Sequence, residues 1–355
     1  MEISEELKFE GCNFIRQRLT FSMLSGRAVT INNIRPLDDD PGIKDHEVKL
    51  LSIFEKISNG TKIIINRTGT QLKFEPGLIQ GGELEVDCGL QRCISYFLEP
   101  LVILAPFCKA PLKVTLKGVT NAPNELSVDA IRATWLPVFN KFVLNDELLS
   151  IKINARGFLP DGGGLVQREK PGKICKIRGL AYVCKVSPSF ASRMIESAKK
   201  AMHGYLADVY ITVDQRKGLQ GGLSPGFGIF LTAETTEGVF YHAAENLLNE
   251  IYRGGSLDCS AQLLATTFMT LCEKDVSRFL FGPLSLYTVH GLRHLKTFFE
   301  QTFKIDELWK LKELKESKQD PEKKNVLNEL RLGSEQKALL TCSGVGYFNI
   351  NKVML

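Results

Sequence analysis

Residues 12–34 read CNFIRQRLTFSMLSGRAVTINNI. The first part carries apolar residues at helical spacing, namely Phe14, Leu19, Phe21, Met23 and Leu24. They predict a helix over Cys12–Ser25. The second part, Ala28–Ile34, is apolar and β-branched and predicts a strand. A helix joined closely to a strand is the beginning of a layered α/β unit.

The sequence beyond this stretch completes the unit and then repeats it. After a Pro/Asp turn, we expect helix Asp45–Ile57, strand Lys62–Asn66 and strand Gln71–Glu75. A second segment predicts helix Asp87–Leu104, strand Leu112–Lys117, an Asn/Pro turn, helix Val128–Phe139 and strand Leu149–Ala155. Asp45 and Ser127 are the expected N-caps. The pattern predicts a duplicated unit of two helices on one face of a mixed sheet.

A third unit is interrupted. Its expected parts are helix Cys259–Cys272, helix Thr288–Phe299 and strand Ala338–Ser343. The residues before it predict strand Gly179–Val186, helix Pro188–His203, strand Asp208–Val213, strand Gly228–Glu234 and helix Ala243–Tyr252. We therefore predict an α+β protein with a core formed by residues 1–172 and 256–355 and a small inserted α+β domain at 173–255.

Composition narrows the class of protein. The chain has 355 residues, of which 44% are hydrophobic and 24% charged, so we expect a globular protein with room for two cores. A net charge of +5 permits a basic patch but does not indicate a nucleic-acid binder. Nine cysteines without a CxxC motif predict reduced thiols, and neither the polar N-terminus nor the interrupted apolar run at 94–112 predicts a signal peptide or membrane segment.

Several motifs carry a resemblance. They are Glu10-Gly11-Cys12-Asn13-Phe14-Ile15-Arg16-Gln17-Arg18-Leu19, Asp38-Asp39-Asp40-Pro41-Gly42, Gly282-Pro283-Leu284-Ser285-Leu286-Tyr287-Thr288 and Leu292-Arg293-His294-Leu295-Lys296. With the architecture, they resemble the RNA 3′-terminal phosphate cyclase family over nearly the whole chain, and its ribosome-biogenesis branch in particular. The resemblance implies three repeats of a four-stranded sheet with two helices, plus a small inserted domain.

Tyr287 stands where the resemblance places the nucleophilic histidine of the cyclases. Imidazole is nucleophilic while neutral near pH 7, whereas a phenol of pKa about 10 is mostly protonated. We therefore expect no catalytic residue at this position, no cyclase activity and no ATP as cofactor.

Other positions depart from the family pattern as well. Cys12 and Asn13 replace a glycine and a glutamine, so only Gly11 remains of a glycine run that would cradle a phosphate. Arg16 is retained, and we expect either a weakened anion site or an exposed helix arginine there. Ala261 replaces an aspartate that helps to hold adenine in the cyclases.

Acidic residues occupy the neighbourhood of a second phosphate contact. Arg35 matches the first of two basic residues that face the RNA 3′-phosphate in the cyclases. Asp38, Asp39 and Asp40 lie near the second and would repel a phosphate unless a divalent cation intervened. The run predicts either a capping turn or a site for a metal or a partner arginine, and no metal-ligand set is assigned.

The remaining matches are weaker. We expect His290 and His294, which follow Tyr287 on one helix, to be exposed or to face a partner. Asn121 and Gly162–Gly164 match family turns. The junctions at 165–170 and 239–246 are shorter than in the family pattern. The charged residues 306–337 predict a solvated helix or flexible excursion or, alternatively, a docking arm.

The resemblance implies a nucleolar factor for pre-rRNA processing and small-subunit biogenesis. Its implied partners are a ribosome-assembly GTPase, pre-rRNA and a small nucleolar ribonucleoprotein of the small-subunit processome, with no membrane. The candidate anion- or RNA-binding residues are Gly11, Asn13, Arg16, Arg35, Arg293, His294 and Lys296. Further basic residues that fit phosphate contact are Arg18, Lys170, Lys173, Lys176 and Arg178.

Two alternatives remain open. The first is an endoribonuclease that cleaves pre-rRNA, with Asp38–Asp40 and the Arg293–Lys296 segment supplying a metal site or a general acid and base. The second is residual cyclase activity. In the insert, glycines at 218, 221, 222, 226 and 228 predict a mobile loop or close backbone packing.

Overall fold

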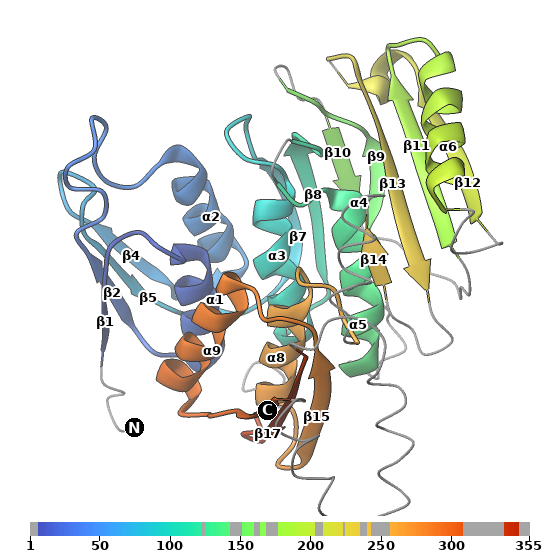
Figure 1. Ribbon diagram of the computed structural model, residues 1–355. Helices are drawn as coiled ribbons and strands as arrows, with labels where there is room; N and C mark the ends of the chain where they lie inside the picture. Colours follow the sequence, from blue (N-terminus) through green and yellow to red (C-terminus); the bar gives the residue numbers. More distant parts are fainter. Residues whose placement is uncertain are drawn as a thin grey trace, which may run out of the picture.

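The computed structural model describes residues 6–122, 125–142, 151–159, 164–167, 177–202, 209–222, 224–234, 240–242, 256–307 and 337–347. It is a mixed α/β molecule in which helices cover one face of several small sheets (Figure 1). The prediction of an α+β fold is confirmed at this level. No helix among the described residues is long and apolar enough to cross a membrane.

The first sheet has the strand order β1-β2-β5-β4. Its strands are β1 (Leu7–Glu10), β2 (Val29–Asn32), β4 (Lys62–Ile65) and β5 (Leu72–Glu75). β1 and β2 are parallel, and the other pairs are antiparallel. Helices α1 (Ile15–Ser25) and α2 (Asp45–Lys56) belong to this unit, and the short strands β3 (Ser58–Asn59) and β6 (Leu78–Ile79) pair with each other. The N-cap of α2 is Lys44, so the prediction of Asp45 as its cap is wrong.

The second sheet has the order β7-β8-β10-β9, with the first pair again parallel. Its strands are β7 (Gly82–Asp87), β8 (Leu112–Gly118), β9 (Lys152–Ala155) and β10 (Gly164–Gln167). The first helix is α3 (Ser95–Leu104), followed by a single turn η1 (Ala105–Phe107). The second comprises α4 (Val128–Ala130), a π-helical turn (Ile131–Trp135) and α5 (Leu136–Phe142), and Ser127 caps it as predicted.

The predicted helix Asp87–Leu104 begins too early. Residues 82–87 form β7, and the helix begins only at Ser95. The segment Gly82–Asp87 alternates polar and apolar residues with period two, which is the pattern of a strand. The predicted helix start lies too early, before Ser95, because the helix that follows β7 is strongly apolar.

The third sheet has three strands among the described residues, in the order β15-β17-β16. They are β15 (Val276–Phe281), β16 (Lys304–Glu307) and β17 (Ala338–Ser343), all antiparallel. Its helices are α8 (Gln262–Leu271) and α9 (Leu286–Phe299). Since a fourth strand is not described, three complete four-stranded repeats remain a prediction. Residues 308–336, which hold most of the predicted charged excursion, lie outside the described part.

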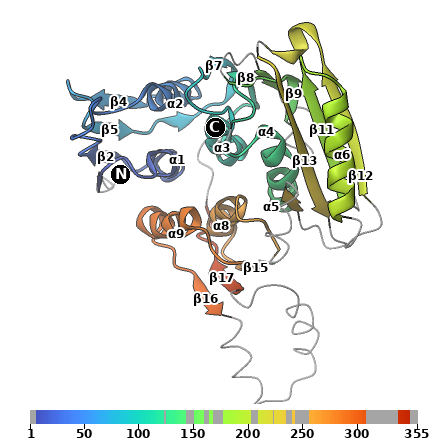
Figure 2. The same cartoon turned by 45° about the horizontal axis from the view of Figure 1, so that its top comes forward.

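The insert forms its own sheet of order β12-β11-β13-β14 with helix α6 (Ser189–Met202) on one face. The strands are β11 (Ile177–Cys184), β12 (Val209–Arg216), β13 (Gly226–Glu234) and β14 (Phe240–His242), with a short turn η3 (Gly218–Gly221). α6 lies on the outer side of the molecule (Figures 1 and 2). The predicted helix Ala243–Tyr252 falls outside the described residues.

Two glycines allow the other face of the insert to approach the core. A Cβ on Gly226 would lie 2.5 Å from the Phe158 ring, and one on Gly228 would lie 2.4 Å from the Tyr182 hydroxyl. Tyr182 and Phe230 pack against Ala130 of α4. These glycines of the predicted cluster therefore serve close packing within the chain.

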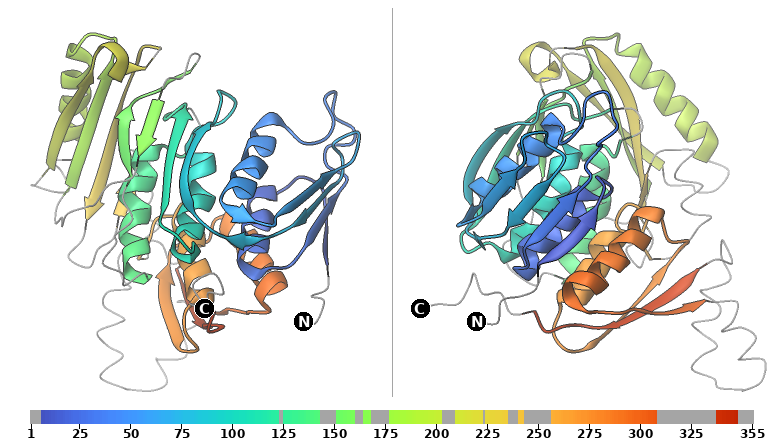
Figure 3. Two further views of the ribbon diagram at one scale, coloured as in Figure 1. Left: turned by 180° about the vertical axis from the view of Figure 1, so that it is seen from behind. Right: turned by 90° about the vertical axis from the view of Figure 1, so that its left-hand side faces the viewer.

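The helices of the three core units share one apolar core. Helix α9 lies beside α1 and α8, and Figure 3 shows the same neighbourhood from behind. A Cβ at Gly291 would lie 2.1 Å from Cδ1 of Leu263, so the close contact of α9 with α8 depends on that glycine. Ser285 caps α9 by accepting a hydrogen bond from the Thr288 amide at 3.1 Å. Helix α9 therefore begins at Leu286, two residues before the predicted start at Thr288, and Tyr287 lies in its first turn.

Candidate functional site

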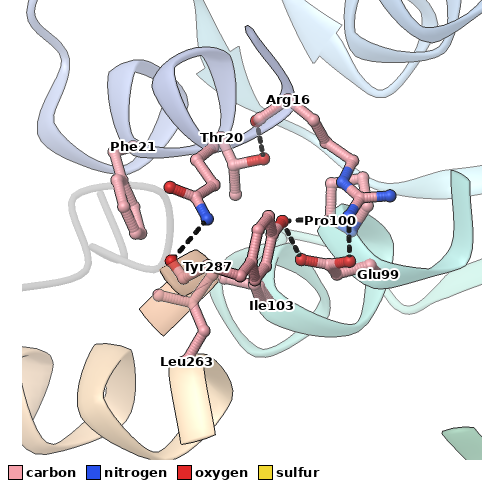
Figure 4. A pocket seen from close by; sticks show the side chains of 9 residues that line it. Arg16, Thr20, Phe21, Glu99, Pro100, Ile103, Leu263 and Tyr287 are labelled. Carbon is pink, nitrogen blue, oxygen red and sulfur yellow. Dashed lines mark hydrogen bonds and ion pairs between the residues drawn. The ribbon is translucent and has the colours of Figure 1, made fainter. Parts of the chain in front are cut away.

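Tyr287 points from α9 into the contact between α1 and α3 (Figure 4). Its hydroxyl accepts a hydrogen bond from Nη2 of Arg16 at 2.9 Å and donates one to Oε1 of Glu99. Arg16 and Glu99 also form an ion pair. Nη1 of Arg16 donates to the carbonyl of Tyr96 at 3.1 Å. Three side chains from three different helices thus close one hydrogen-bonded ring.

Little space remains around this ring. The cavity has a volume of about 10 Å³, which is the room that one water molecule needs. It is lined by Arg16, Gln17, Thr20, Phe21, Glu99, Pro100, Ile103, Leu263 and Tyr287. In this conformation the site has no room for a nucleotide.

Burial fixes the charge states in the ring. It raises the pKa of the Tyr287 phenol, against the opposing influence of the Arg16 charge. Burial alone would lower the pKa of Arg16, but Glu99, Tyr287 and Tyr96 together outweigh burial, so the pKa of Arg16 lies above its ordinary value. The phenol is therefore neutral near pH 7 and bridges the Arg16–Glu99 ion pair. A neutral phenol is a poor nucleophile.

A second chain of hydrogen bonds leads from Tyr287 to His294. Nε2 of Gln17 donates to the Tyr287 carbonyl at 3.1 Å, which leaves Oε1 of Gln17 as the acceptor for Nδ1 of His294 at 2.9 Å. This arrangement requires the proton of His294 on Nδ1. The imidazole is only 7% exposed, so the expectation of an exposed histidine is wrong for His294.

The environment keeps His294 neutral. Burial, and then the charges of Arg18 and His290, lower the pKa of His294 to about 4. Its ring meets the Phe9 ring edge-on, with centroids 5.7 Å apart. The neighbouring His290 stacks on Phe14, with centroids 4.3 Å apart. Both histidines thus pack against the segment that leads into α1, and His294 is placed to support the fold and not to reach a phosphate.

Arg35 is held by a buried carboxylate. Its Nη1 and Nη2 donate to the two carboxylate oxygens of Glu47 at 2.8 and 2.7 Å, and Nη1 also reaches the Gly42 carbonyl at 3.0 Å. These hydrogen bonds outweigh burial and raise the pKa of Arg35. Glu47 also accepts from the Lys44 amide at the start of α2. In this conformation Arg35 ties the β2–α2 loop to α2.

Residues 11–14, which form the entrance to α1, keep some features of an anion site. Gly11 has φ +70° and open space beside it, and Asn13 is exposed. Arg18 is 7% exposed and donates to the Gly11 carbonyl at 2.8 Å. No carboxylate pairs with Arg18 in the described part of the chain, and burial lowers the pKa of its guanidinium. Whether this entrance binds an anion remains a prediction.

Asp38, Asp39 and Asp40 form an exposed turn between β2 and α2. Asp40 pairs with Nζ of Lys44 at 2.7 Å. Within the described residues, no group of three or more His, Cys, Asp or Glu side chains is arranged to hold a metal ion. The turn is thus partly neutralised by its own neighbour.

Arg293 and Lys296 are exposed and one helical turn apart on α9. Nη1 of Arg27 donates to the carbonyl of Thr297 at 3.0 Å and so lies beside them. In the described part of the chain, neither Arg293 nor Lys296 has an ion-pair partner. We call Arg27, Arg293 and Lys296 the α9 basic face.

The remaining predicted positions are structural or undescribed. Ala261 is buried, and Gln262 bonds to the Pro283 carbonyl, the Ser285 amide and the Thr288 hydroxyl, which shapes the turn before Tyr287. Asn121 donates to the Tyr182 hydroxyl of the insert at 3.1 Å. Lys170, Lys173, Lys176 and residues 160–163 fall outside the described ranges.

Sequence reasoning missed the acidic partners. Glu99 is one of the residues that interrupt the apolar run at 94–112, and a single carboxylate inside a buried helix needs a cationic partner. Glu47 stands three residues after the cap of α2, which is a capping-box position. Both signals were present in the sequence, but neither named the arginine that would pair with it.

The chain is similar to known proteins over most of its length. The family model described as "RNA 3'-terminal phosphate cyclase" matches residues 7–305. A "Probable RNA 3'-terminal phosphate cyclase-like protein" of Caenorhabditis elegans is 56% identical, covering 99% of this chain and 100% of that protein. The "RNA 3'-terminal phosphate cyclase-like protein" of Homo sapiens is 43% identical, covering 99% of each chain.

A more distant relative carries a functional name. The "rRNA processing protein rcl1" of Schizosaccharomyces pombe is 34% identical, covering 99% of each chain. The alignment with the Caenorhabditis elegans protein spans 388 positions, whereas this chain has 355 residues, so at least 33 positions are filled only in the relative. This difference fits the two short junctions without locating them. A family model that covers most of the chain and relatives that align over its full length lead to one conclusion: the chain belongs to the RNA 3′-terminal phosphate cyclase family.

Proposed function

We propose that this protein is a non-cyclase factor for pre-rRNA processing in small-subunit biogenesis, acting in the nucleolus. Its proposed partners are a ribosome-assembly GTPase, pre-rRNA and a small nucleolar ribonucleoprotein of the small-subunit processome. Two observations support the role in processing: the resemblance to the ribosome-biogenesis branch, and the name of the Schizosaccharomyces pombe relative. We also propose that residues 256–355 form a third repeat, since β15, β17 and β16 repeat the order of the last three strands of the first two sheets.

The ring formed by Tyr287, Arg16 and Glu99 carries the non-cyclase part of the proposal. A covalent nucleotidyl step needs a nucleophile with access to the α-phosphate of a nucleotide. Here the phenol is neutral, already hydrogen-bonded on both sides, and surrounded by a cavity that fits one water. The arginine that could meet a phosphate is paired with a carboxylate instead.

The α9 basic face is the proposed contact with RNA. Exposed Arg and Lys side chains without acidic partners are suited to phosphate oxygens. Such contacts depend on the charge of the RNA and not on its base sequence, so we expect assembly partners to supply the specificity for pre-rRNA. Each phosphate contact contributes to the salt dependence of RNA affinity, with a slope of about 0.7 per phosphate on a single strand.

The test is complementation in cells depleted of the protein. Wild-type protein should restore mature small-subunit rRNA, whereas Arg293→Ala/Lys296→Ala should leave unprocessed precursors on an RNA blot. The matched control is Lys113→Ala/Lys117→Ala, which removes two exposed lysines that are already paired with Glu83 and Glu85. Normal processing without the protein would contradict the proposal.

Cleavage of pre-rRNA by the chain itself is a second candidate, and the exposed pair Arg293 and Lys296 is the observation that favours it. In the described conformation His294 is buried, and Asp38–Asp40 do not form part of a group that could hold a metal ion. A general acid and base, or a metal ion, would therefore have to come from a rearranged site or from a partner. Purified protein incubated with a pre-rRNA fragment and Mg²⁺ separates the two candidates. Specific cleavage that Arg293→Ala abolishes would support the nuclease.

A further inference from the structure

The insert carries an aromatic and cationic cluster that the proposed function does not use. Phe190 in the first turn of α6 and Phe227 at the start of β13 have ring centroids 4.9 Å apart and planes 30° apart. The guanidinium carbon of Arg193 lies 4.6 Å from the centroid of the Phe190 ring. Phe227 remains 50% exposed. A half-exposed ring supported by a second ring is a rigid flat surface at the solvent boundary.

Sheet topology brings further cations to the same end of the insert. Strands β11 and β12 are parallel, with Cys184 paired to Arg216 at their carboxyl ends. β13 runs the opposite way and begins with Gly226 paired to Cys184. The exposed residues Lys185 and Lys217, which follow β11 and β12, therefore lie at the sheet end where Phe227 begins its strand. The carboxyl end of parallel strands is also the usual place for ligands in open α/β sheets.

The charge of the insert points to an anionic occupant. Residues 173–255 include ten Lys or Arg and seven Asp or Glu, a net charge of +3, whereas the whole chain carries +5. One of these acids, Asp214, is paired with Arg156 and Arg216. With Arg193 beside Phe190 and with Lys185 and Lys217 at the same end of the sheet, the end of the insert that carries Phe227 is both aromatic and positively charged.

A surface that is both aromatic and cationic suits a ligand that carries both negative charge and flat rings, as a nucleic acid does. Only an unpaired strand exposes its bases for stacking on a protein ring. We propose that Phe190, Phe227 and Arg193 form a platform for single-stranded RNA, with one base stacked on Phe227 and adjacent phosphates at Lys185 and Lys217. The inference rests on the proposed function, since it takes pre-rRNA as the RNA that the chain meets. The platform lies on the inserted domain and is separate from the α9 basic face.

The test measures binding of fluorescein-labelled 12-nucleotide oligouridylate and oligoadenylate to the full chain by fluorescence polarisation. Phe227→Ala should weaken binding roughly 5- to 150-fold, which is the range for one base stacked on an aromatic ring. Phe227→Trp should retain binding. Lys185→Ala/Lys217→Ala should lower the salt slope by roughly 1.4, since each phosphate contact on a single strand contributes about 0.7. A duplex of the same length should be unaffected by Phe227→Ala.

Tyr210→Ala is the matched control. Tyr210 is 61% exposed on the same sheet, but on the face opposite to α6, because its neighbours Val209 and Ile211 pack with the α6 residues. Its removal should leave oligonucleotide affinity unchanged. Equal losses in the two variants, or unchanged binding by Phe227→Ala, would overturn the platform. Loss of a protein partner with intact RNA binding in Phe227→Ala would also overturn it and assign the surface to that partner.

The outcome is separable from that of the proposed function. If Arg293→Ala/Lys296→Ala blocks processing while Phe227→Ala binds RNA as wild type, the platform is wrong and the processing role stands. If depleted cells process rRNA normally while Phe227→Ala loses oligonucleotide binding, the processing role is wrong and the platform stands.

Discussion

The hydroxyl of Tyr287 donates its hydrogen bond to the carboxylate of Glu99, across 188 positions of sequence. The contact joins the first turn of α9 in the third core unit to the middle of α3 in the second. Arg16, from the first unit, donates to the same hydroxyl. The position that resembles a catalytic nucleophile therefore holds the three units of the core together.

Replacing Tyr287 by Phe tests that structural role. The change removes only the hydroxyl, so Arg16 and Glu99 each lose one hydrogen bond in a buried site. We expect a loss of about 1.5–3 kcal/mol in the free energy of unfolding, measured with urea, because the lost bonds are to charged groups. The control Tyr210→Phe, at a position 61% exposed, should change stability by less than about 0.5 kcal/mol. Similar values for the two variants would contradict the role assigned to Tyr287.

Replacing Tyr287 by His should not create a cyclase. The smaller ring would vacate some volume, but Arg16 would remain paired with Glu99, and Cys12 and Asn13 would still stand at the entrance to α1. Incubation with radiolabelled ATP followed by denaturing gel electrophoresis should show no covalent adenylate in either protein. A labelled band that appears with Tyr287→His alone would show that the nucleotide site is intact.

Glu99→Gln should lower the free energy of unfolding by more than Tyr287→Phe does. It leaves the cation of Arg16 in a buried site without its counter-charge, for which about 3–5 kcal/mol is typical. In the double variant Arg16→Met/Glu99→Gln the unpaired charge is gone, so the loss should be smaller than the sum of the losses in Arg16→Met and Glu99→Gln. Urea denaturation of all three variants gives the coupling energy. Strictly additive losses would mean that the ion pair contributes nothing.

The sequence predicts the elements of this fold better than their partners. Helix Asp45–Ile57 and strand Ala338–Ser343 are found within one residue of their predicted bounds, because each has a clear period and clear flanking residues. β1 was missed, because four residues beside a polar terminus give too short a pattern. The pairing of Arg16 with Glu99 could not be predicted, since it depends on how separate units pack.

The resemblance located the site but did not describe its present state. It matched Tyr287, Arg16 and Arg35 to positions of the family's site, and it suggested that the arginines could face an anion. The structure shows a carboxylate on each arginine. Local sequence patterns describe one helix or strand at a time, whereas the charge of a pocket is the sum over side chains from several helices.

His294 should make the protein sensitive to acid. Its pKa is about 4 in the fold against an ordinary 6.5, so between pH 6.5 and 4 the unfolded chain binds a proton that the folded chain does not. Stability should therefore fall as pH falls through this window, by roughly 3 kcal/mol in total from this group. In His294→Gln the fall should be smaller by that amount, as measured by urea denaturation at pH 7, 6, 5 and 4. Identical pH profiles for the two proteins would show that His294 titrates normally.

Arg156 should hold the insert against the core. It is 2% exposed, and it donates to Oδ2 of Asp129 on α4 at 2.7 Å and to Oδ2 of Asp214 on β12 at 3.0 Å. Its guanidinium also lies 4.4 Å from the centre of the Tyr182 ring. Arg156→Met leaves two carboxylates without their shared cation, at the boundary between the insert and the second core unit.

Hydrogen exchange can detect this loosening directly. In Arg156→Met, the backbone amides of β11 and β13 should exchange faster than in the wild type, and the free energy of unfolding should fall by roughly 3–5 kcal/mol. The control Arg216→Ala breaks a partly exposed pair with the same Asp214, and a loss of only about 0–1 kcal/mol is expected. Arg156→Lys should restore little, because a lysine ammonium cannot bridge both carboxylates with the planar geometry of a guanidinium. Unchanged exchange in β11 and β13 of Arg156→Met would mean that apolar packing of Tyr182 and Phe230 alone orients the insert.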